Sequence, residues 1–329
     1  MYGTGPMGEP RTTLTVAKGD TARDFEFAEL PELLADPDAR VWIDLENTGA
    51  AGFDALAPAL VFHPMAVEDC VQDVNFPRVD DYDEYVYMAV HSARWGADEA
   101  SPTIKELDIL LGRDFLVTYH EEPTRGVTRA HELVCRRGQL LSKGPDHLLY
   151  LILDVMVDNY MPILERVDAE VDRLEEKVLH APSHELLTEI LSFKRGIAAL
   201  RRIVGPQRDT ILTLTRDEYD LISPEMRPYL RDVFDRLARI SDLLDSFRDE
   251  LATMLDIYVS QVSNQLNEVM KVLTAITVII VPVTLVASIF GMNVIFPGFN
   301  TPAGFYAAMG IMVLTALGMW WYFRSRRWL

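Results

Sequence analysis

Residues 272–290 read VLTAITVIIVPVTLVASIF, and this uncharged run of 19 residues decides what kind of protein the chain forms. A second run of 19, residues 305–323, reads FYAAMGIMVLTALGMWWYF and is also free of charge. A helix crosses a bilayer with about 17–25 apolar residues. The two runs therefore predict two membrane spans joined by a short outer loop, residues 291–304. The alternative, a buried helical hairpin of a soluble protein, is disfavoured because buried helices seldom reach this length without charge.

The residues that flank the second span predict its orientation. An aromatic belt, Trp320–Tyr322, precedes the arginines Arg324, Arg326 and Arg327. Cytoplasmic flanks carry an excess of Lys and Arg, so the C-terminus is expected in the cytoplasm. Two spans then place the N-terminal body there as well, in keeping with a first 20 residues that lack the apolar core of a signal peptide. We expect a multi-pass protein of the inner cell membrane, with both termini cytoplasmic.

Charge is distributed unevenly along the chain. The net charge is −19, and the three arginines after the second span leave −22 for residues 1–271. Such an acidic body argues against a nucleic-acid partner, because phosphate contacts need basic surface. An enzyme is also disfavoured, since no nucleophile motif or cluster of catalytic partners is evident. Cys70 and Cys135 are too few for a disulfide framework, and we expect both to be buried free thiols in a reducing compartment.

Hydrophobic periodicity divides the chain into three parts. Residues 1–145 mix short β-branched runs with turns and predict an α/β domain, with strands near 41–45, 85–90, 104–111 and 115–119 and a helix that starts at His63-Pro64. Residues 146–270 show apolar steps of three and four, which predict one helix to about 178, a second to about 215, and a long stalk helix. Residues 271–329 form the membrane domain. The predicted fold class is α+β.

The stalk and the first span are predicted to be one helix. Neither Gly nor Pro occurs between Tyr229 and Val281, so the helical pattern runs from Arg227 to Phe290. Its 64 residues would extend about 96 Å. A helix of that length cannot fit inside a globule, and we expect it to project the acidic body away from the membrane.

A polar stripe runs along one face of this helix at an average spacing of 3.5 residues. Its members are Ser263, Asn267, Met270, Thr274, Thr277, Val281, Thr284 and Ser288. A hydroxyl-rich stripe in a span is compatible with close helix packing through small polar residues. It is also compatible with several copies surrounding water, so that the stripe lines a pore. The second interpretation requires a homo-oligomer, because one chain with two spans cannot enclose a pore.

Several motifs together resemble one family. Gly291-Met292-Asn293 follows the first span, the stalk carries Asn267-Glu-Val-Met-Lys271, and two spans lie at the C-terminal end. In this combination the chain resembles the CorA family of magnesium transport proteins over nearly its whole length. The resemblance implies a homopentameric funnel, five first spans around the pore, and transported as well as regulatory Mg²⁺.

The resemblance also implies roles for individual residues. Gly291, Met292 and Asn293 would form the outer selectivity filter. Polar and apolar rings of Asn267, Met270, Leu273, Thr277, Val281, Thr284 and Ser288 would line the pore. Glu68, Asp69, Asp232 and Asp256 would bind metal on the cytoplasmic side. The outer loop lacks the acidic residue that many members carry, and Phe290 stands where Tyr is frequent.

Magnesium chemistry suits these residues. Mg²⁺ prefers six oxygen ligands and gives up water reluctantly, so neutral Asn293 amides could accept hydrogen bonds from its hydration shell. We therefore expect electrochemically driven influx of hydrated Mg²⁺, with Co²⁺ and Ni²⁺ as further candidates. A transporter of Zn²⁺ or another divalent ion on the same fold is the nearest alternative. A membrane-anchored scaffold or sensor that passes no ion is a second alternative.

Overall fold

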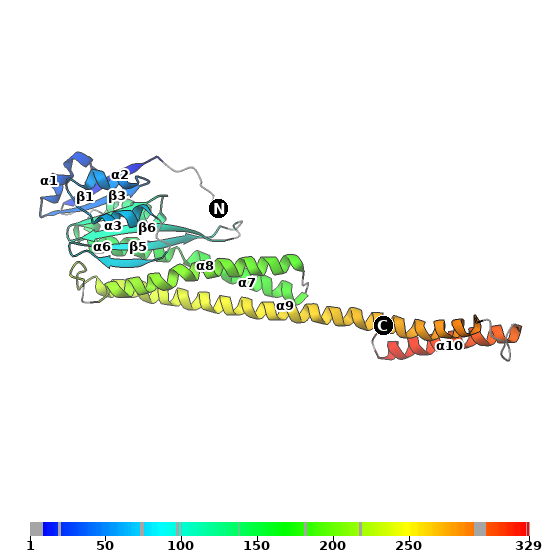
Figure 1. The fold of residues 1–329 in the computed structure, drawn as a ribbon. Coiled ribbons are helices and arrows are strands. Elements are labelled where there is room, and N and C mark those ends of the chain that lie inside the picture. Colours follow the sequence, from blue (N-terminus) through cyan, green and yellow to red (C-terminus); the bar gives the residue numbers. More distant parts are fainter. Residues whose placement is uncertain are drawn as a thin grey trace. The chain divides into compact units, whose positions relative to one another are not determined.

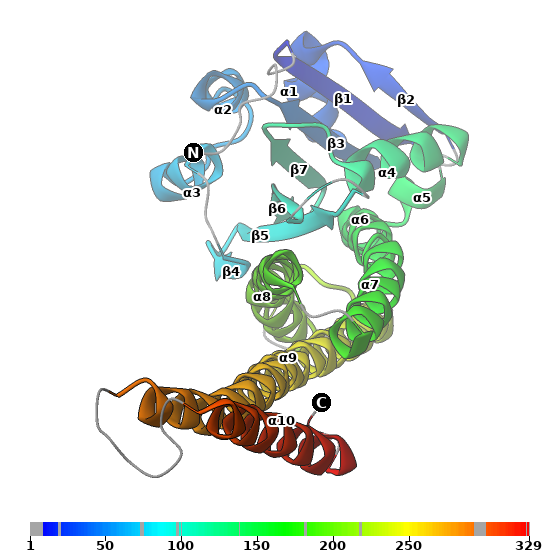
Figure 2. The same cartoon turned by 90° about the vertical axis from the view of Figure 1, so that its right-hand side faces the viewer.

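The computed structural model describes residues 9–18, 21–72, 76–96, 99, 101–137, 139–180, 183–216, 219–292, 301–326 and 328. Contacts divide the chain into two compact units. The first comprises the residues up to Glu176 together with His184–Thr253, and the second comprises Lys177–Ser183 and the residues from Met254 onward. Figures 1 and 2 show the elements of each unit. The division into three domains drawn from the sequence stays a prediction.

A seven-stranded mixed sheet organises the first unit, in the order β2-β1-β3-β7-β6-β5-β4. Only the central β3 and β7 pair in parallel, and all other neighbours are antiparallel. The strands are β1 (Arg11–Lys18), β2 (Thr21–Phe25), β3 (Ala39–Glu46), β4 (Arg78–Asp81), β5 (Tyr85–Arg94), β6 (Thr103–Gly112) and β7 (Phe115–His120). The four predicted strands correspond to β3, β5, β6 and β7. The predicted α+β class with an N-terminal sheet domain and long C-terminal helices is confirmed.

Helices cover both faces of this sheet (Figure 2). One face is covered by the 3₁₀ helix η1 (Phe27–Glu29), α1 (Leu30–Leu34), α2 (Ala50–Leu56) and α3 (Pro64–Val71). The other face contacts α4 (Arg125–Arg136), α5 (Gln139–Ser142), α6 (Pro145–Asp158) and α8 (His184–Leu214). The remaining helices are α7 (Met161–His180), α9 (Arg227–Phe290) and α10 (Pro302–Ser325).

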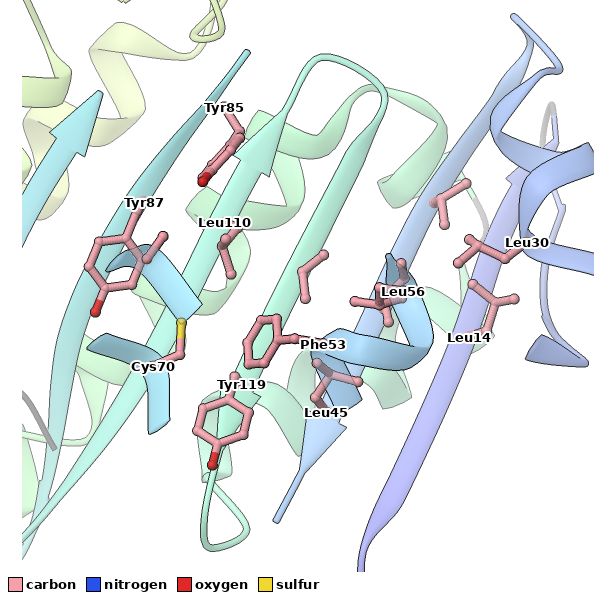
Figure 3. Packing of buried hydrophobic residues seen from close by; sticks show 14 of the residues in the cluster. Leu14, Leu30, Leu45, Phe53, Leu56, Cys70, Tyr85, Tyr87, Leu110 and Tyr119 are labelled. Atoms are coloured by element: carbon pink, nitrogen blue, oxygen red, sulfur yellow. The ribbon is translucent and has the colours of Figure 1, made fainter. Parts of the chain in front are cut away.

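The first face of the sheet carries the core shown in Figure 3. Leu45, Leu56 and Tyr87 are fully buried there, and Cys70 of α3 is also buried among them. α3 begins at Pro64, as the His63-Pro64 pair predicts. His63 caps it, because its Nδ1 accepts from the Met65 amide at 3.2 Å. Burial raises the pKa of the Cys70 thiol far above its ordinary value, so Cys70 is an inert core residue.

The second cysteine corrects the sequence interpretation. Cys135 is exposed rather than buried. It lies on α4, whose buried residues are Gly126, Val127, Ala130 and Val134, so the helix turns position 135 toward solvent. Composition favours burial for a cysteine in general, but only the packed face of the helix decides the individual case.

The first predicted long helix is also corrected, because it is two helices. α6 ends at Asp158 and α7 begins at Met161, with a turn at Asn159–Tyr160. Pro162 has no amide hydrogen to donate to the carbonyl of Asp158, so an unbroken helix would lose that bond. The buried Tyr160 instead donates its hydroxyl to the carbonyl of His91 at 3.0 Å. This contact joins the turn to strand β5.

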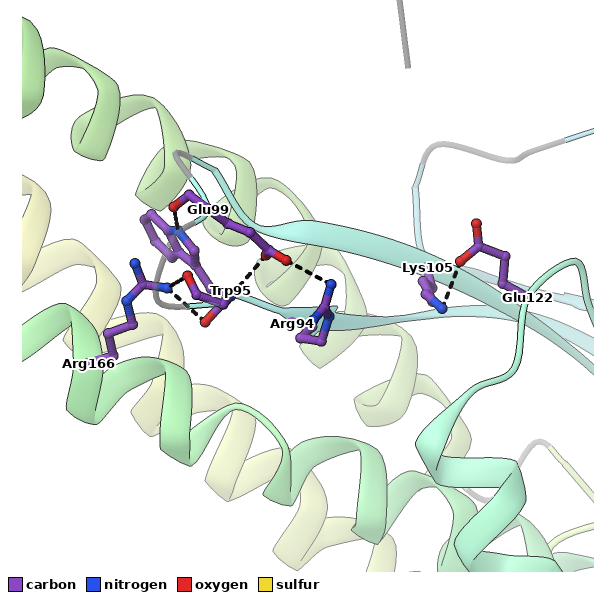
Figure 4. A network of polar contacts seen from close by, with 7 residues as sticks. Arg94, Trp95, Glu99, Lys105, Glu122 and Arg166 are labelled. Carbon is purple, nitrogen blue, oxygen red and sulfur yellow. Dashed lines mark hydrogen bonds and ion pairs between the residues drawn. The ribbon is translucent and has the colours of Figure 1, made fainter. Parts of the chain in front are cut away.

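A polar network joins the β5–β6 end of the sheet to α7 (Figure 4). Arg166 of α7 donates to the carbonyls of Trp95 (2.8 Å) and Gly96. The Trp95 ring stacks on Phe193 of α8, with centroids 4.7 Å apart. A Cβ atom at Gly196 would lie 2.5 Å from the Trp95 ring, so glycine is required at this approach.

His120 gives the first unit a pH-dependent contact. Its Nε2 lies 3.1 Å from Asp44 Oδ1, and both side chains are largely buried. Burial lowers the pKa of His120, but the hydrogen bond and charge of Asp44 outweigh it and raise the pKa above the ordinary 6.5. The contact therefore stabilises the fold fully at a pH below the pKa that His120 has in the unfolded chain. This stabilisation is lost as the pH rises through the higher pKa that His120 has in the folded chain.

We expect His120→Gln to lower the unfolding temperature of the purified chain at about pH 6, and the deficit to shrink toward about pH 9. Glutamine has no titrating proton and keeps a similar size. His184→Gln is the matched control, since it makes the same replacement at an exposed histidine of the first unit. A deficit that is the same at both pH values would contradict the assignment.

Candidate functional site

The helix α9 carries the candidate ion pathway. It is continuous from Arg227 to Phe290, as its sequence predicts, and it includes Pro282 without ending there. A proline inside a helix removes one backbone hydrogen bond, here the one to the carbonyl of Val278. Together with α10, the part of α9 from Met254 onward belongs to the second unit.

One face of the outer part of α9 is covered. Its buried or half-buried residues recur at steps of three and four, as one helical face requires. They are Ala275, Ile279, Pro282, Val283, Val286 and Phe290. α10 lies beside this part of α9 in both views (Figures 1 and 2). We infer that α10 covers this face.

The polar stripe lies on the opposite face and is open. All of its residues and the adjacent Leu273 are exposed in the single chain: Ser263, Asn267, Met270, Leu273, Thr274, Thr277, Val281, Thr284 and Ser288. Successive helical residues are about 100° apart, which places the centre of this stripe about half a turn from the covered face. The second helix of the same chain therefore leaves the stripe uncovered.

Two threonines of the stripe leave their hydroxyl oxygens available as hydrogen-bond acceptors. Thr277 Oγ1 donates to the carbonyl of Leu273 at 2.8 Å, and Thr284 Oγ1 donates to that of Ile280 at 3.0 Å. Each hydroxyl proton is thus used within the helix, and the oxygen lone pairs remain for an outside donor. Water bound to a cation is such a donor.

The N-terminal part of the stripe is hollowed. Asn267, Met270 and Thr274 line this hollow together with Trp328. Lys271 pairs there with Glu268, at 3.6 Å between Nζ and Oε1. This end of the stripe therefore combines amide, thioether and hydroxyl groups beside a charged pair.

The chain after α9 is described only as far as Met292. Gly291 donates its amide to the carbonyl of Ala287 at 2.9 Å, which adds a helical hydrogen bond beyond Phe290. A Cβ atom at Gly291 would lie 3.2 Å from the same carbonyl, a tight approach that favours glycine. Asn293, the residue assigned to the selectivity ring, lies outside the described residues. Of the three predicted filter residues, the structure therefore describes only Gly291 and Met292.

Asp69, one of the predicted regulatory carboxylates, has an arginine partner within the chain. Asp69 forms an ion pair with Arg78, which also pairs with Asp80 at 3.1 Å. Glu68 is exposed and accepts a hydrogen bond from Gln72 at 3.2 Å. A metal ion at Asp69 would therefore compete with a guanidinium.

A second arginine serves the carboxylates at the start of α9. Arg236 lies 3.2 Å from Asp232 through Nε and 2.7 Å from Asp158 through Nη1, and it also pairs with Asp154. The sequence prediction did not include this arginine, although the step of four from Asp232 to Arg236 is a recognisable helical pair. Asp256 is exposed on the same helix. The one group of three potential metal ligands in the described ranges includes none of these predicted residues.

Three helical stretches of the described chain are long and apolar enough to cross a membrane. In the stretch Pro145–Leu179, half of the most apolar 18-residue segment is buried inside the chain. Its residues Leu148, Leu149 and Ile152 are fully buried. The corresponding 18-residue segments of α9 and α10 are only 6% buried. Exposed apolar helices of this length are typical of membrane spans, whereas the buried stretch belongs to the sheet domain.

Known proteins resemble the chain along most of its length. The family model described as CorA-like Mg2+ transporter protein matches residues 38–327. The cobalt/magnesium transport protein CorA of Thermotoga maritima is 32% identical over 319 residues, which covers 93% of this chain and 89% of that protein. The protein of the same name from Methanocaldococcus jannaschii is 25% identical and covers 94% of this chain and 98% of its own length.

Solved structures share the fold. The complete CorA magnesium transporter of Methanocaldococcus jannaschii superposes with a TM-score of 0.84 at 22% identity, covering 97% of this chain and 98% of that one. The full-length CmaX protein superposes with a TM-score of 0.79 at 20% identity, covering 98% and 99%. The match of the family model over most of the chain and the 32% identity to a full-length relative lead to one conclusion. The chain belongs to the CorA-like Mg²⁺ transporter family, a family of membrane transporters rather than of enzymes.

Proposed function

We propose that the chain forms a homopentameric channel for hydrated Mg²⁺, in which five copies of α9 surround the ion path and α10 lies outside them. The observation that carries the proposal is the open polar stripe opposite the face that α10 covers. A face with hydroxyl, amide and thioether groups has no favourable partner in lipid, so it must meet protein or water. Five copies around an axis would supply the water-filled space.

The proposed path has a polar lip and an apolar constriction. Asn293 would form the outer ring on the turn made by Gly291 and Met292. Thr284, Ser288, Thr277 and Asn267 would offer oxygen acceptors to the water shell of the ion. Met270, Leu273 and Val281 would narrow the path and close it by dewetting.

The proposed driving force is the membrane potential. Moving one charge through 100 mV changes the free energy by about 2.3 kcal/mol, so a divalent ion gains about 4.6 kcal/mol from an inside-negative potential. In this proposal both termini are cytoplasmic and the protein resides in the inner cell membrane. Co²⁺ and Ni²⁺ share the hydrated size class and are further cargo candidates. Relatives named cobalt/magnesium transport proteins support this range.

The direct test is magnesium flux into liposomes that hold the purified full chain. We expect influx that rises with an inside-negative potential and that protein-free vesicles lack. Vesicles that stay impermeable to Mg²⁺ at every potential and internal concentration would refute the proposal. They would leave the membrane-anchored scaffold as the better interpretation.

Regulation by internal Mg²⁺ is the second element of the proposal. Glu68, Asp69, Asp232 and Asp256 supply the oxygen ligands that Mg²⁺ prefers. Asp232 is 64% exposed, so its carboxylate is available to a neighbouring subunit in spite of its contact with Arg236. Cations that bridge such carboxylates would hold the closed state, and depletion would release it by a population shift.

We expect Asp232→Asn to weaken the protection that Mg²⁺ gives the closed protein against proteolysis. The Mg²⁺ concentration for half protection should rise several-fold, because a neutral amide is a poorer ligand than a carboxylate. Asp235→Asn is the control, since it removes one exposed carboxylate from the same helix. The same half-protection concentration in wild type and Asp232→Asn would contradict the assignment.

A further inference from the structure

Three side chains of different chemistry converge on the surface of the sheet domain. His131 and Cys135 are four residues apart on α4, so they lie on the same helical face. Asp24 approaches them from β2. Donor atoms of the three residues all lie within 4.8 Å of one another, and within the described ranges this is the one such group of three.

Two of the three distances between the donors are close to those of a tetrahedral zinc site. Zinc lies about 2.0–2.1 Å from histidine nitrogen, about 2.3 Å from cysteine sulfur and about 2.0–2.2 Å from carboxylate oxygen. Tetrahedral angles then place nitrogen about 3.6 Å from sulfur and about 3.4 Å from oxygen. In the structure His131 Nε2 lies 3.7 Å from Cys135 Sγ and 3.3 Å from Asp24 Oδ1. Cys135 Sγ also lies 3.9 Å from Nδ1, so binding requires the imidazole to turn about its Cβ–Cγ bond until one ring nitrogen faces the ion.

Neighbouring residues contact two of the three ligands. Thr15 of β1 faces Asp24 across the strand pair and donates its hydroxyl to Asp24 Oδ1 at 2.7 Å. The ring of His131 lies against the buried Trp42, with centroids 5.9 Å apart. A hydrogen-bonded outer partner such as Thr15 orients a metal ligand and increases affinity.

We propose that Asp24, His131 and Cys135 bind a divalent transition-metal ion of the zinc class. A thiolate and an imidazole favour such an ion over Mg²⁺, which prefers oxygen ligands alone. Asp24 and His131 are 53% and 32% exposed, so water can occupy the fourth position and the ion can exchange. The site has a different ligand chemistry from the pathway of the transported ion, and it does not rest on the proposed transport function.

Metal binding would fasten the edge of the sheet. β2 is the terminal strand and pairs only with β1. A bond from Asp24 to a metal held by α4 would tie this edge to the helix beside it. A ligand that binds only the folded state stabilises it, so zinc should raise the unfolding temperature of the first unit.

Cobalt(II) is the probe that tests the site, with the full chain in detergent. We expect one equivalent of Co²⁺ to produce intense visible bands of tetrahedral cobalt and a near-ultraviolet band from thiolate to cobalt. Hydrated Co²⁺ in a transport path is octahedral and has no thiolate ligand, so it gives neither signal. Millimolar Mg²⁺ should leave the bands unchanged, and zinc should remove them.

Variants assign the signal to individual ligands. Cys135→Ser should abolish the thiolate band, whereas Cys70→Ala should keep it because Cys70 is buried in the core. Asp24→Asn should weaken cobalt binding by at least about tenfold, since removing a direct ligand costs no less than removing an outer partner. The absence of tetrahedral bands in wild type, or a thiolate band that persists in Cys135→Ser, would overturn the proposal.

Discussion

Replacing Asn293 with alanine is expected to reduce magnesium influx into liposomes by at least about a hundredfold. A hydrogen bond to a charged partner contributes about 1.5–3 kcal/mol, and a symmetric pentamer loses five amides at once. Half of the free energy lost with five such hydrogen bonds already exceeds roughly 2.7 kcal/mol, the value that corresponds to a hundredfold change in rate. The measurement is the initial rate of Mg²⁺ entry at a fixed inside-negative potential.

Asn300→Ala is the matched control, because it removes an amide from the same loop but outside the Gly291-Met292-Asn293 motif. We expect this variant to keep the wild-type rate. If Asn293→Ala also keeps that rate, the filter assignment is wrong while transport itself stands. If wild type shows no flux, the transport proposal fails instead, so the two outcomes are distinguishable.

The second large effect is expected at Val281, in the apolar part of the stripe. Val281→Ser should raise Mg²⁺ leak at high internal Mg²⁺ by about tenfold or more, because five hydroxyls would let water wet the constriction. Val281 is 57% exposed in the single chain, so the substitution disturbs little packing within it. The measurement is flux at an internal Mg²⁺ concentration that keeps the wild type closed.

Val283→Ser provides the control, two residues along the same helix. Val283 is half-buried on the face that we assign to α10. Its replacement should lower the unfolding temperature of the detergent-solubilised protein and leave the closed-state leak unchanged. The pore assignment would be refuted by equal leak in the two variants, or by a leak that increases only in Val283→Ser.

The long helix shows where sequence reasoning is strong. The bounds predicted for α9, Arg227 and Phe290, coincide with those of the structure. This is because helix continuity depends on local properties, namely periodic apolar residues and the absence of Gly and Pro up to Val281. The assignment to the CorA family also followed from local motifs, and the family model and the relatives confirm it.

The sheet domain shows where sequence reasoning is weaker. Strands β1, β2 and β4 were not predicted, although β1 has the β-branched residues Thr12, Thr13, Thr15 and Val16. β4 is short and polar, and its pairing with β5 defines it. The order of strands depends on contacts between distant segments, such as the parallel pair of β3 and β7, and periodicity contains no information on these.

The charged residues also show the difference between what the sequence suggests and what the folded chain reveals. Asp69 and Asp232 were assigned by their resemblance to family positions. Arg236 could have been paired with Asp232 from their helical spacing, whereas the pairing of Arg78 with Asp69 became evident only from the folded chain. The convergence of Asp24 with His131 and Cys135 is likewise tertiary, since 107 residues separate Asp24 from His131. A metal site depends on distances of a few ångströms, which sequence separation does not determine.

Three features could be recognised without any knowledge of contacts between distant segments: two long uncharged runs, one continuous helix into the first run, and a polar stripe along it. These follow from composition and helical period, which are properties of neighbouring residues. Which face of that helix is covered and which is open is a property of the folded chain, because coverage depends on a second helix that returns beside it (Figures 1 and 2). Burial depends on contacts between distant segments, whereas periodicity does not. Burial therefore distinguishes a polar stripe that is open to ions from one that packs against another helix of the same chain.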